Sequence, residues 1–374
     1  MEDDDFARRV YCVLGVPVDQ ISMPGLVARI HRAASKRDPL FLTTPNLNYL
    51  MLSQRDPAFR RSLLESDVCP ADGVGVILIC RLLGIPISSR VAGSDLPAAL
   101  RRVQTSSGKG LRVALMGGDP GVGERARAVI NAGDMERLLC VAAIDPGVVT
   151  RDKLDDPDIV QQINATRADF LLVALGAQKG QAWLMRNRGN LTVPVVSHLG
   201  ATLNFLAGAV KRAPEGIRKL GLEWLWRIKE EPKLAPRYLS DGARLAWLLL
   251  TRVLPLSLWL RRARKYGVAQ GNGVWLDMDE PRYCAVTLAG DFGDAELAPV
   301  VEAFRGAVQS GLDISLDFSR VKSFGMAFAG QVLMLEKSQQ KKSLSLTIVG
   351  AAPTVSRALG WCGLGYLKSN DASS

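Results

Sequence analysis

Short apolar runs alternate with amphipathic segments over the first two hundred residues. The runs are rich in Val, Leu, Ile and Ala, and they end in Gly, Pro, Asn or Asp. They predict five buried strands, at 39–44, 111–116, 138–144, 169–175 and 193–198. Intervening stretches such as 123–133 have the periodicity of a helix. Buried strands that alternate with helices predict an α/β fold with a Rossmann-like, mostly parallel sheet and helices on both faces.

A second α/β pattern follows a basic cluster and the Gly-rich stretch GVAQGNG. It predicts strands at 274–278, 283–290, 313–319 and 344–350, and helices at 296–311, 327–340 and 354–363. We therefore expect four segments. They are an α/β core over 1–210, a basic segment rich in Trp and Leu over 211–266, a linker over 267–274 and a small α/β module over 275–374.

The excess positive charge lies in one part of the chain. Residues 211–265 hold fourteen Lys and Arg against five Asp and Glu, a net +9 of the chain's +10. Within them, residues 245–260 form an apolar run that would be about 24 Å long as a helix, against about 30 Å for a hydrocarbon core. Arg252 at mid-length and Pro255 disfavour a spanning helix. We expect an interfacial helix facing anionic lipid, and an amphipathic helix packed on the protein itself is the alternative. A nucleic-acid surface fits less well, because the apolar run would lie exposed beside phosphates.

The composition narrows the class of protein. With 374 residues, 48% hydrophobic and 22% charged, the chain can form two folded domains. Its six cysteines are scattered without a CxxC pair, and its acidic N-terminus has no apolar signal segment, so we expect a reducing cytosol. There are only two histidines, which disfavours a Ser-His-Asp or Cys-His hydrolase, although His198 lies at a strand end.

Candidate chemistry lies in the turns that follow the predicted strands, where ligands bind in parallel sheets. Asp72, in CPADGVGV, could serve as a general base, although an isolated Asp-Gly is more often an Asx turn. Thr44 and Asn46 offer a hydroxyl and a carboxamide. The Gly-rich turn at 116–126 suits a diphosphate, but it matches neither G-x-G-x-x-G nor a P-loop.

Two Asp-x-Asp triplets, at 156–158 and 277–279, imitate a metal site. The first begins a charged helical stretch, where acidic residues favour the N-terminus, and the second lies next to the linker. We expect neither to bind metal, and the sequence calls for no cofactor.

Eight sequence motifs occur along the chain in the order that is found in one known protein family. They are T-x-N at 44–46, PADGVGV at 70–76, RVAGSDL at 90–96, GGDPGV at 117–122, GAQK at 176–179, HLGATLNFLAG at 198–208, KRAP at 211–214 and GLEWLWRIKEEP at 221–232. Over about residues 10–240 the chain resembles the WecG/TagA/CpsF family of bacterial glycosyltransferases.

The resemblance implies an inverting, metal-independent transfer of a hexose-type sugar. The donor would be a UDP-sugar, and the acceptor a polyprenyl-diphosphate-linked saccharide at the cytoplasmic face of the bacterial inner membrane. The protein would be peripheral and would act in surface-polysaccharide synthesis. By motif, Asp72 would be the base and Thr44 and Asn46 would line the sugar site. The other implied substrate contacts are Arg90, Gly117, Gly118, Gln178 and Asn204, with Arg212, Arg227 and Arg237 from the appendage that meets the membrane.

Two departures from the family pattern bear on the sugar specificity. Asn204 replaces a common Asp, so an acidic contact is missing, and Lys233 replaces an Arg that could form a bidentate contact. The loop at 142–150 also matches no pattern of the family.

The C-terminal module resembles a STAS domain, chiefly in LDFSRVKSFGMAFAGQVLML at 316–335. That resemblance implies docking to a protein partner, and we expect no nucleic-acid partner. Two other functions remain open. One is an inactive family member that acts as a scaffold through the STAS-like module, which Asn204 favours. The other is a dinucleotide-dependent oxidoreductase, which would lack its fingerprint glycines.

Overall fold

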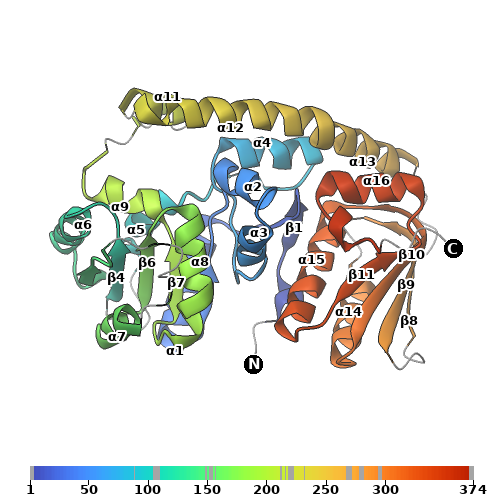
Figure 1. Ribbon diagram of the computed structural model, residues 1–374, viewed down its shortest axis with the longest axis horizontal. Helices are drawn as coiled ribbons and strands as arrows, with labels where there is room; N and C mark the ends of the chain where they lie inside the picture. Colours follow the sequence, from blue (N-terminus) through green and yellow to red (C-terminus); the bar gives the residue numbers. More distant parts are fainter. Residues whose placement is uncertain are drawn as a thin grey trace. The chain divides into compact units, whose positions relative to one another are not determined.

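The computed structural model describes the chain apart from a few short stretches. The residues outside the description are 1–3, 88, 104–109, 148–149, 151–154, 156, 211–212, 215, 218–222, 231, 267–271, 278–281, 294–296 and 370–374. The rest forms two compact units (Figure 1). The first joins residues 1–20, 77–88 and 243–374, and the second joins residues 21–76 and 89–242. This partition follows contacts rather than sequence order, and the division into four consecutive segments remains a prediction.

The second unit contains a five-stranded parallel sheet. Its strands are β3 (Leu40–Leu42), β4 (Leu111–Gly117), β5 (Leu138–Ile144), β6 (Phe170–Ala174) and β7 (Val195–His198). They lie in the order β3-β7-β6-β4-β5. All five strands were predicted from the apolar runs, and the parallel sheet is confirmed.

Helices cover both faces of this sheet (Figure 1). On one face they are α1 (Met23–Lys36), α5 (Leu96–Leu100), α6 (Val122–Asn131) and α9 (Gly200–Leu206), and on the other α7 (Pro157–Ala165) and α8 (Ala177–Asn187). The unit also contains α2 (Leu47–Ser53), α3 (Pro57–Leu64) and α11 (Glu223–Glu230). Neighbouring residues of one strand enter different cores, because side chains alternate across a sheet. Leu172 belongs to one buried cluster, whereas Leu171 and Val173 belong to the other. Because both faces of each strand are buried, the strand sequences are continuous apolar runs.

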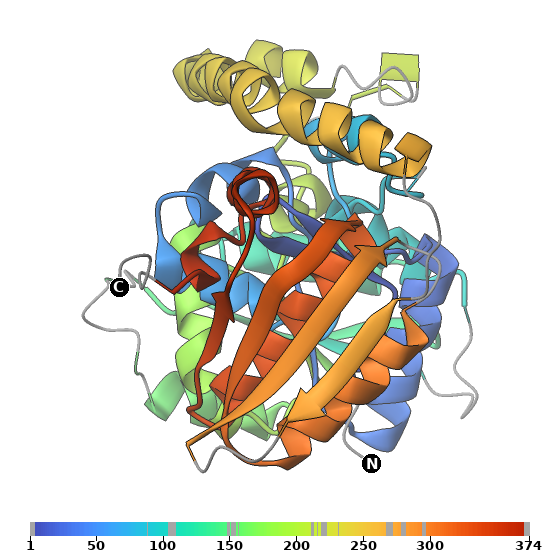
Figure 2. The same cartoon turned by 90° about the vertical axis from the view of Figure 1, so that its right-hand side faces the viewer.

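The first unit contains the predicted STAS-like sheet (Figure 2). Its strands are β8 (Gly273–Asp277), β9 (Tyr283–Phe292), β10 (Asp313–Phe324) and β11 (Leu346–Val349), in the order β11-β10-β9-β8. Strand β8 runs antiparallel to β9, and the other pairs are parallel. Helices α14 (Ala298–Gln309), α15 (Met326–Lys341) and α16 (Pro353–Cys362) complete the module as predicted.

The first unit also contains a β-hairpin that the sequence reading missed. Strands β1 (Val10–Val13) and β2 (Val16–Asp19) pair antiparallel around a two-residue turn. Leu14 and Gly15 have φ of 53° and 80°, as a tight primed turn requires. The signal was present, since VYCV and VPVD are runs of strand-forming residues separated by Leu-Gly. Helix α4 (Val74–Leu83) contributes residues from 77 onward to the same unit.

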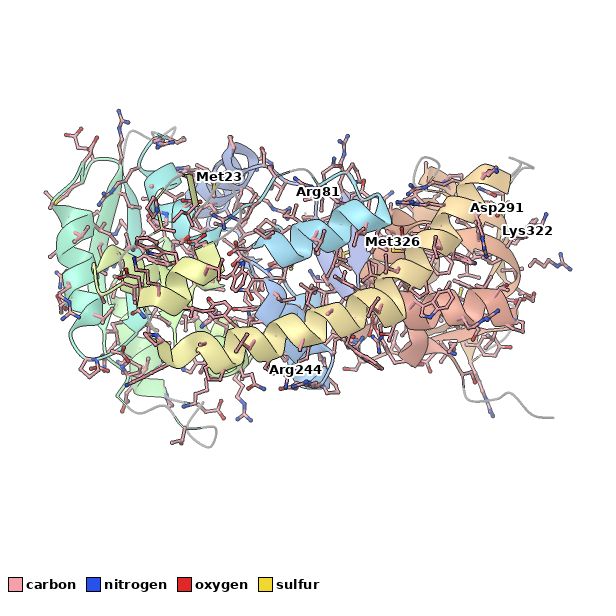
Figure 3. The ribbon with its side chains drawn as sticks, turned by 90° about the horizontal axis from the view of Figure 1, so that it is seen from above. Met23, Arg81, Arg244, Asp291, Lys322 and Met326 are labelled. Carbon is pink, nitrogen blue, oxygen red and sulfur yellow. The ribbon has the colours of Figure 1, made fainter. Side chains whose placement is uncertain are left out.

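The apolar run near the end of the basic segment is part of one continuous helix. Helix α12 (Ala235–Leu248), the π-helical turn η6 (Leu249–Val253) and α13 (Leu254–Tyr266) follow without a break, as Figure 3 shows. We expected Pro255 to interrupt the ladder of hydrogen bonds. The π turn lies directly before it and accommodates the missing N–H donor. Residues 238–265 are long and apolar enough to cross a membrane by length and composition, and 28% of the apolar window is buried.

The two faces of this helix differ. Leu248, Val253, Leu256 and Leu260 are buried, and the Ser257 hydroxyl donates to the Leu82 carbonyl at 2.6 Å. The opposite face carries an exposed apolar stripe, which comprises Trp247, Leu250, Leu254 and Leu258. The helix thus packs on its own unit, as the alternative expected, and its other face exposes an apolar stripe. Contact of that stripe with lipid stays a prediction.

Candidate functional site

The turns singled out from the sequence meet at the carboxyl edge of the five-stranded sheet. Thr43 follows β3, and its N–H donates to the Val68 carbonyl at 3.0 Å. Further along, the Asp72 N–H donates to the Pro45 carbonyl at 3.0 Å. These bonds hold the loop around Asp72 beside the loop that carries Thr44 and Asn46. The parallel sheet thus brings together groups about thirty residues apart.

Asp72 is half-buried in this edge. Gly73, which follows it, has φ of +85°, a conformation that favours glycine. The Gly93 N–H donates to Asp72 Oδ2 at 3.4 Å. Burial raises the pKa of Asp72 from 3.8 to about 6, although Arg90 and the Gly93 N–H act in the opposite direction. A carboxylate with this pKa is ionised at neutral pH and is a stronger base than an ordinary aspartate.

Arg90 is held by a carboxylate from the basic segment. Its Nη1 lies 2.8 Å from Glu223 Oε2, and the two side chains are 22% and 16% exposed. Glu223 begins α11, so it lies in the GLEWLW block, far from Arg90 in sequence. In the sequence, Glu223 has no feature of a site residue, because a glutamate at the start of a helix usually stabilises the helix dipole. Arg90 interacts electrostatically with both Asp72 and Glu223.

Thr44 and Asn46 lie beside Asp72. Thr44 is 5% exposed, and a Cβ at Gly93 would lie 3.2 Å from its Oγ1. Asn46 is the N-cap of α2, where its Oδ1 accepts the Tyr49 N–H at 3.2 Å. A Cβ at Gly73 would lie 3.7 Å from the Asn46 Cβ. The cap uses the amide oxygen of Asn46 and orients its side chain, while the amide nitrogen remains as a donor.

Gly117 and Gly118 form the turn after β4, with φ of +87° and +91°. The Gly118 N–H donates to the Ala174 carbonyl at 2.8 Å, and a Cβ at Gly117 would approach that oxygen to 2.6 Å. A side chain at Gly117 is therefore excluded by both conformation and space. The turn faces α9, since a Cβ at Gly118 would lie 3.7 Å from Leu203, the neighbour of half-buried Asn204.

Other predicted site residues are placed differently. Gln178, in α8, donates from Nε2 to Asp56 Oδ2 at 3.0 Å, so its amide is turned toward the start of α3. Arg212 lies outside the described residues. Arg227 lies in α11 and Arg237 in α12, and their side chains lie outside the description.

His198 lies in a buried polar pair. Its Nδ1 shares a hydrogen bond of 2.6 Å with the Tyr49 hydroxyl, and burial lowers its pKa to about 4. A Cβ at Gly180 would lie 2.1 Å from the imidazole ring, so the ring packs directly on the backbone of α8. The contacts at Nδ1 involve a tyrosine rather than the carboxylate of a hydrolase triad. Tyr49 is a contact that the sequence reading did not predict.

The two Asp-x-Asp triplets are only partly described, because Asp156, Met278 and Asp279 lie outside the description. Asp158 begins α7 and Asp277 ends β8. Within the described part of the chain, no group of three or more His, Cys, Asp and Glu side chains could hold a metal ion.

A half-buried carboxylate, a hydroxyl and an arginine gathered at the carboxyl edge of a parallel sheet are typical of a Rossmann-like enzyme site. The model of the glycosyl transferase WecG/TagA/CpsF family matches residues 11–257, and the chain belongs to this family. A second model, "Mlab, STAS domain", matches residues 278–368.

Curated relatives include N-acetylglucosaminyldiphosphoundecaprenol N-acetyl-beta-D-mannosaminyltransferases from Staphylococcus aureus strains MRSA252 and NCTC 8325 / PS 47. Each is 27% identical over 218 residues, which cover 58% of this chain and 82% of the relative. Among solved structures, the unphosphorylated anti-sigma factor antagonist SpoIIAA is 17% identical. It covers 26% of this chain and 86% of its own, with a TM-score of 0.23. The STAS assignment therefore depends on the family model and on the observed topology.

The raised pKa of Asp72 predicts a pH-dependent cost to stability. The folded state binds the proton of Asp72 more tightly than the unfolded state does. The bound proton therefore stabilises the folded state fully below pH 3.8, and this stabilisation is lost as pH rises through about 6. Asp72→Asn cannot ionise. Between pH 4 and pH 8 the free energy of unfolding of this variant should therefore rise, relative to that of the wild type, by on the order of 2 kcal/mol. Urea denaturation at several pH values measures this change, and Asp158→Asn, at an exposed position of α7, is the control. A difference in free energy of unfolding between variant and wild type that stays constant with pH would contradict the raised pKa of Asp72.

Proposed function

We propose that this protein is a peripheral membrane glycosyltransferase of bacterial surface-polysaccharide synthesis. It moves a hexose-type sugar, with inversion and without a metal ion, from a UDP-sugar to a polyprenyl-diphosphate-linked saccharide. The observation that carries the proposal is Asp72, a half-buried carboxylate with a pKa of about 6 beside Thr44 and Arg90. Membership of the family supports the transfer, and the relatives' names support a lipid-linked acceptor.

In the proposed reaction Asp72 takes the proton from an acceptor hydroxyl. The oxygen then attacks the anomeric carbon of the donor as the bond to the diphosphate breaks, and UDP leaves. One displacement inverts the anomeric centre. Because the pKa of Asp72 is about 6, most of the population carries the base form at neutral pH. Thr44 and Asn46 contact the sugar, and the oriented amide of Asn46 supplies hydrogen bonds.

The departing UDP requires positive charge and hydrogen-bond donors. Arg90 is pre-oriented by Glu223, and guanidinium groups stabilise diphosphate without a metal ion. The Gly117–Gly118 turn leads into α6, whose N-terminus favours an anion. Arg212, Arg227 and Arg237 from the basic segment add charge when that segment closes on the site. Gln178 and Asn204 complete the set of substrate contacts in this proposal.

The basic segment also accounts for membrane binding. The exposed stripe of Trp247, Leu250, Leu254 and Leu258 lies on a helix whose C-terminal end carries the exposed cations Arg261, Arg262 and Lys265. Apolar side chains that insert beside cations are typical of binding to anionic lipid surfaces. We place this surface at the cytoplasmic face of the inner membrane, where the lipid-linked acceptor would reside.

Asn204 favours one other function. Since the family commonly has Asp at this position, the chain could be an inactive member that serves as a scaffold through its STAS-like domain. The described geometry around Asp72 argues for the enzyme, because the base and Arg90 are held as a reaction would need.

The assay that separates these functions is UDP release by the full-length protein. It uses a panel of UDP-sugars, a short-chain polyprenyl-diphosphate sugar in detergent, and EDTA. Acceptor-dependent release from one donor supports the transferase and identifies its sugar. Release that requires an added divalent metal would contradict the metal-independent step. Failure with every donor and with lipid extract from the native host would favour the scaffold.

Removal of the base should stop transfer. We expect Asp72→Asn to lower kcat by about 10²-fold or more while UDP-sugar binding stays within a few-fold, because a carboxamide cannot accept the proton. Steady-state UDP release and donor binding by calorimetry measure the two effects. Asp158→Asn removes an exposed acid from α7 and should leave both unchanged. Turnover near that of the wild type would exclude Asp72 as the base.

Glu223 should act on the site through Arg90. Glu223→Gln removes a negative charge that helps to raise the pKa of Asp72, so the acid limb of the pH–rate profile should move to lower pH. The rate above pH 7 should fall by on the order of tenfold, because Arg90 loses its orienting carboxylate. Glu230→Gln, on the same helix, is the matched control. An unchanged acid limb would show that Glu223 acts only in folding.

Membrane binding should depend on the exposed stripe. Trp247 is 68% exposed, and we expect Trp247→Ser to weaken sedimentation with anionic vesicles by about tenfold. Trp275, 52% exposed on β8, offers the control Trp275→Ser, which should bind as the wild type does. An equal loss of vesicle binding in both variants would contradict the assignment of the exposed stripe as the membrane-binding surface.

A further inference from the structure

Helix α15 of the STAS-like domain is buried on all sides. A helix that covers one face of a small sheet normally exposes its outer side to water. In α15, however, every residue from Met326 to Lys337 is buried, as is Gln339. Its inner side holds Phe328, whose ring packs among the rings of Phe292, Phe304, Phe318 and Phe324. Another segment must therefore cover the outer side.

That segment is the N-terminal hairpin. A Cβ at Gly330 would lie only 2.2 Å from the Val10 carbonyl oxygen, so β1 packs directly on the helix backbone. Gln331 donates from Nε2 to the Arg8 carbonyl at 3.4 Å. At the hairpin turn, a Cβ at Gly363 would lie 2.4 Å from the Gly15 nitrogen. Absence of a side chain at Gly330 is thus a condition of the contact.

A buried ionic cluster makes the contact selective. The Lys337 side chain is 0% exposed, and its Nζ lies 2.7 Å from Asp5 Oδ1. Arg8 is also buried, and it pairs with Asp5 at 3.3 Å and Asp19 at 2.8 Å. Burial by itself would raise the pKa of Asp5, but Lys337 and Arg8 outweigh it and hold the pKa below its usual value. A buried ammonium without its carboxylate is strongly unfavourable, so an apolar segment of another sequence would not replace the hairpin.

The hairpin and α15 come from different family matches. The glycosyl transferase model begins at residue 11, whereas the STAS model covers residues 278–368. We propose that α15 is an internal docking surface whose partner is residues 4–20 of the same chain. The STAS-like domain therefore holds the first elements of the transferase sequence, and this face is closed to a diffusible protein partner.

The first test compares two glycine substitutions in the full-length protein. Gly330→Ala places a methyl group against Val10, whereas a Cβ at Gly360, in α16 of the same domain, meets nothing within 4 Å. We expect hydrogen exchange of residues 10–19 to accelerate by about tenfold or more in Gly330→Ala and to remain unchanged in Gly360→Ala. Exchange in β9 and β10 reports whether the domain remains folded. Equal protection of the hairpin in both variants would overturn the proposal.

The second test addresses the ionic cluster. Lys337→Met should increase exchange at residues 10–19, because Asp5 then loses its buried ammonium partner and keeps only Arg8 and the exposed Lys341. Adding Asp5→Asn to that variant should restore part of the protection, which loss of packing alone would not predict. Arg357→Met, at an exposed position of α16, removes a cation of the same domain that does not contact residues 4–20 and serves as the control. A double variant no better protected than Lys337→Met would contradict the pairing.

The third measurement asks whose hairpin occupies α15. Protection of residues 10–19 that is unchanged on about hundredfold dilution supports docking within one chain. Protection that falls on dilution, together with a dimer in light scattering, would show that a second copy supplies the hairpin. That result would overturn the proposal for the single chain.

Discussion

The candidate site depends on the parallel pairing of β3, β7, β6 and β4. Parallel strands bring all their carboxyl ends to one edge, so turns that are far apart in sequence become neighbours. The bond from the Asp72 N–H to the Pro45 carbonyl adds a loop that belongs to no strand. Without that anchor Asp72, the proposed base, would have no fixed position relative to Thr44. The chemistry of the site is thus a consequence of strand direction.

Charge at the site is arranged around Arg90. Burial makes the ionised form of Asp72 costly, and Arg90 reduces that cost without removing it. Glu223 holds Arg90 from the other direction, and it lies on α11 of the basic segment. The segment that carries the exposed apolar stripe therefore also contributes to the electrostatics around Asp72. A base with a pKa near neutrality and an oriented guanidinium suit a transfer with an anionic leaving group.

In the first compact unit, charged side chains are buried together in one cluster. Asp5, Arg8, Asp19 and Lys337 are buried together, where each would be unfavourable by itself. Such a cluster tolerates few alternative partners, which fits a contact within one chain. The same unit leaves the apolar stripe of α12 and α13 exposed, although Leu256 and Leu260 on the opposite face are buried. One long helix therefore serves both packing and, in our proposal, membrane binding.

Much of this protein could be predicted from local sequence pattern. The five parallel strands, the STAS-like module, the family blocks and the apolar run each depend on residues close together in the chain, where periodicity and turn residues act directly. Other features depend on residues far apart: the Arg90–Glu223 pair, the rise in the pKa of Asp72, and the hairpin on α15. Burial and long-range pairing decide these, because the free energy of a charge is set by its surroundings. For Lys337, an ordinary charged residue of a helix by sequence, only the tertiary structure reveals that it is buried against Asp5.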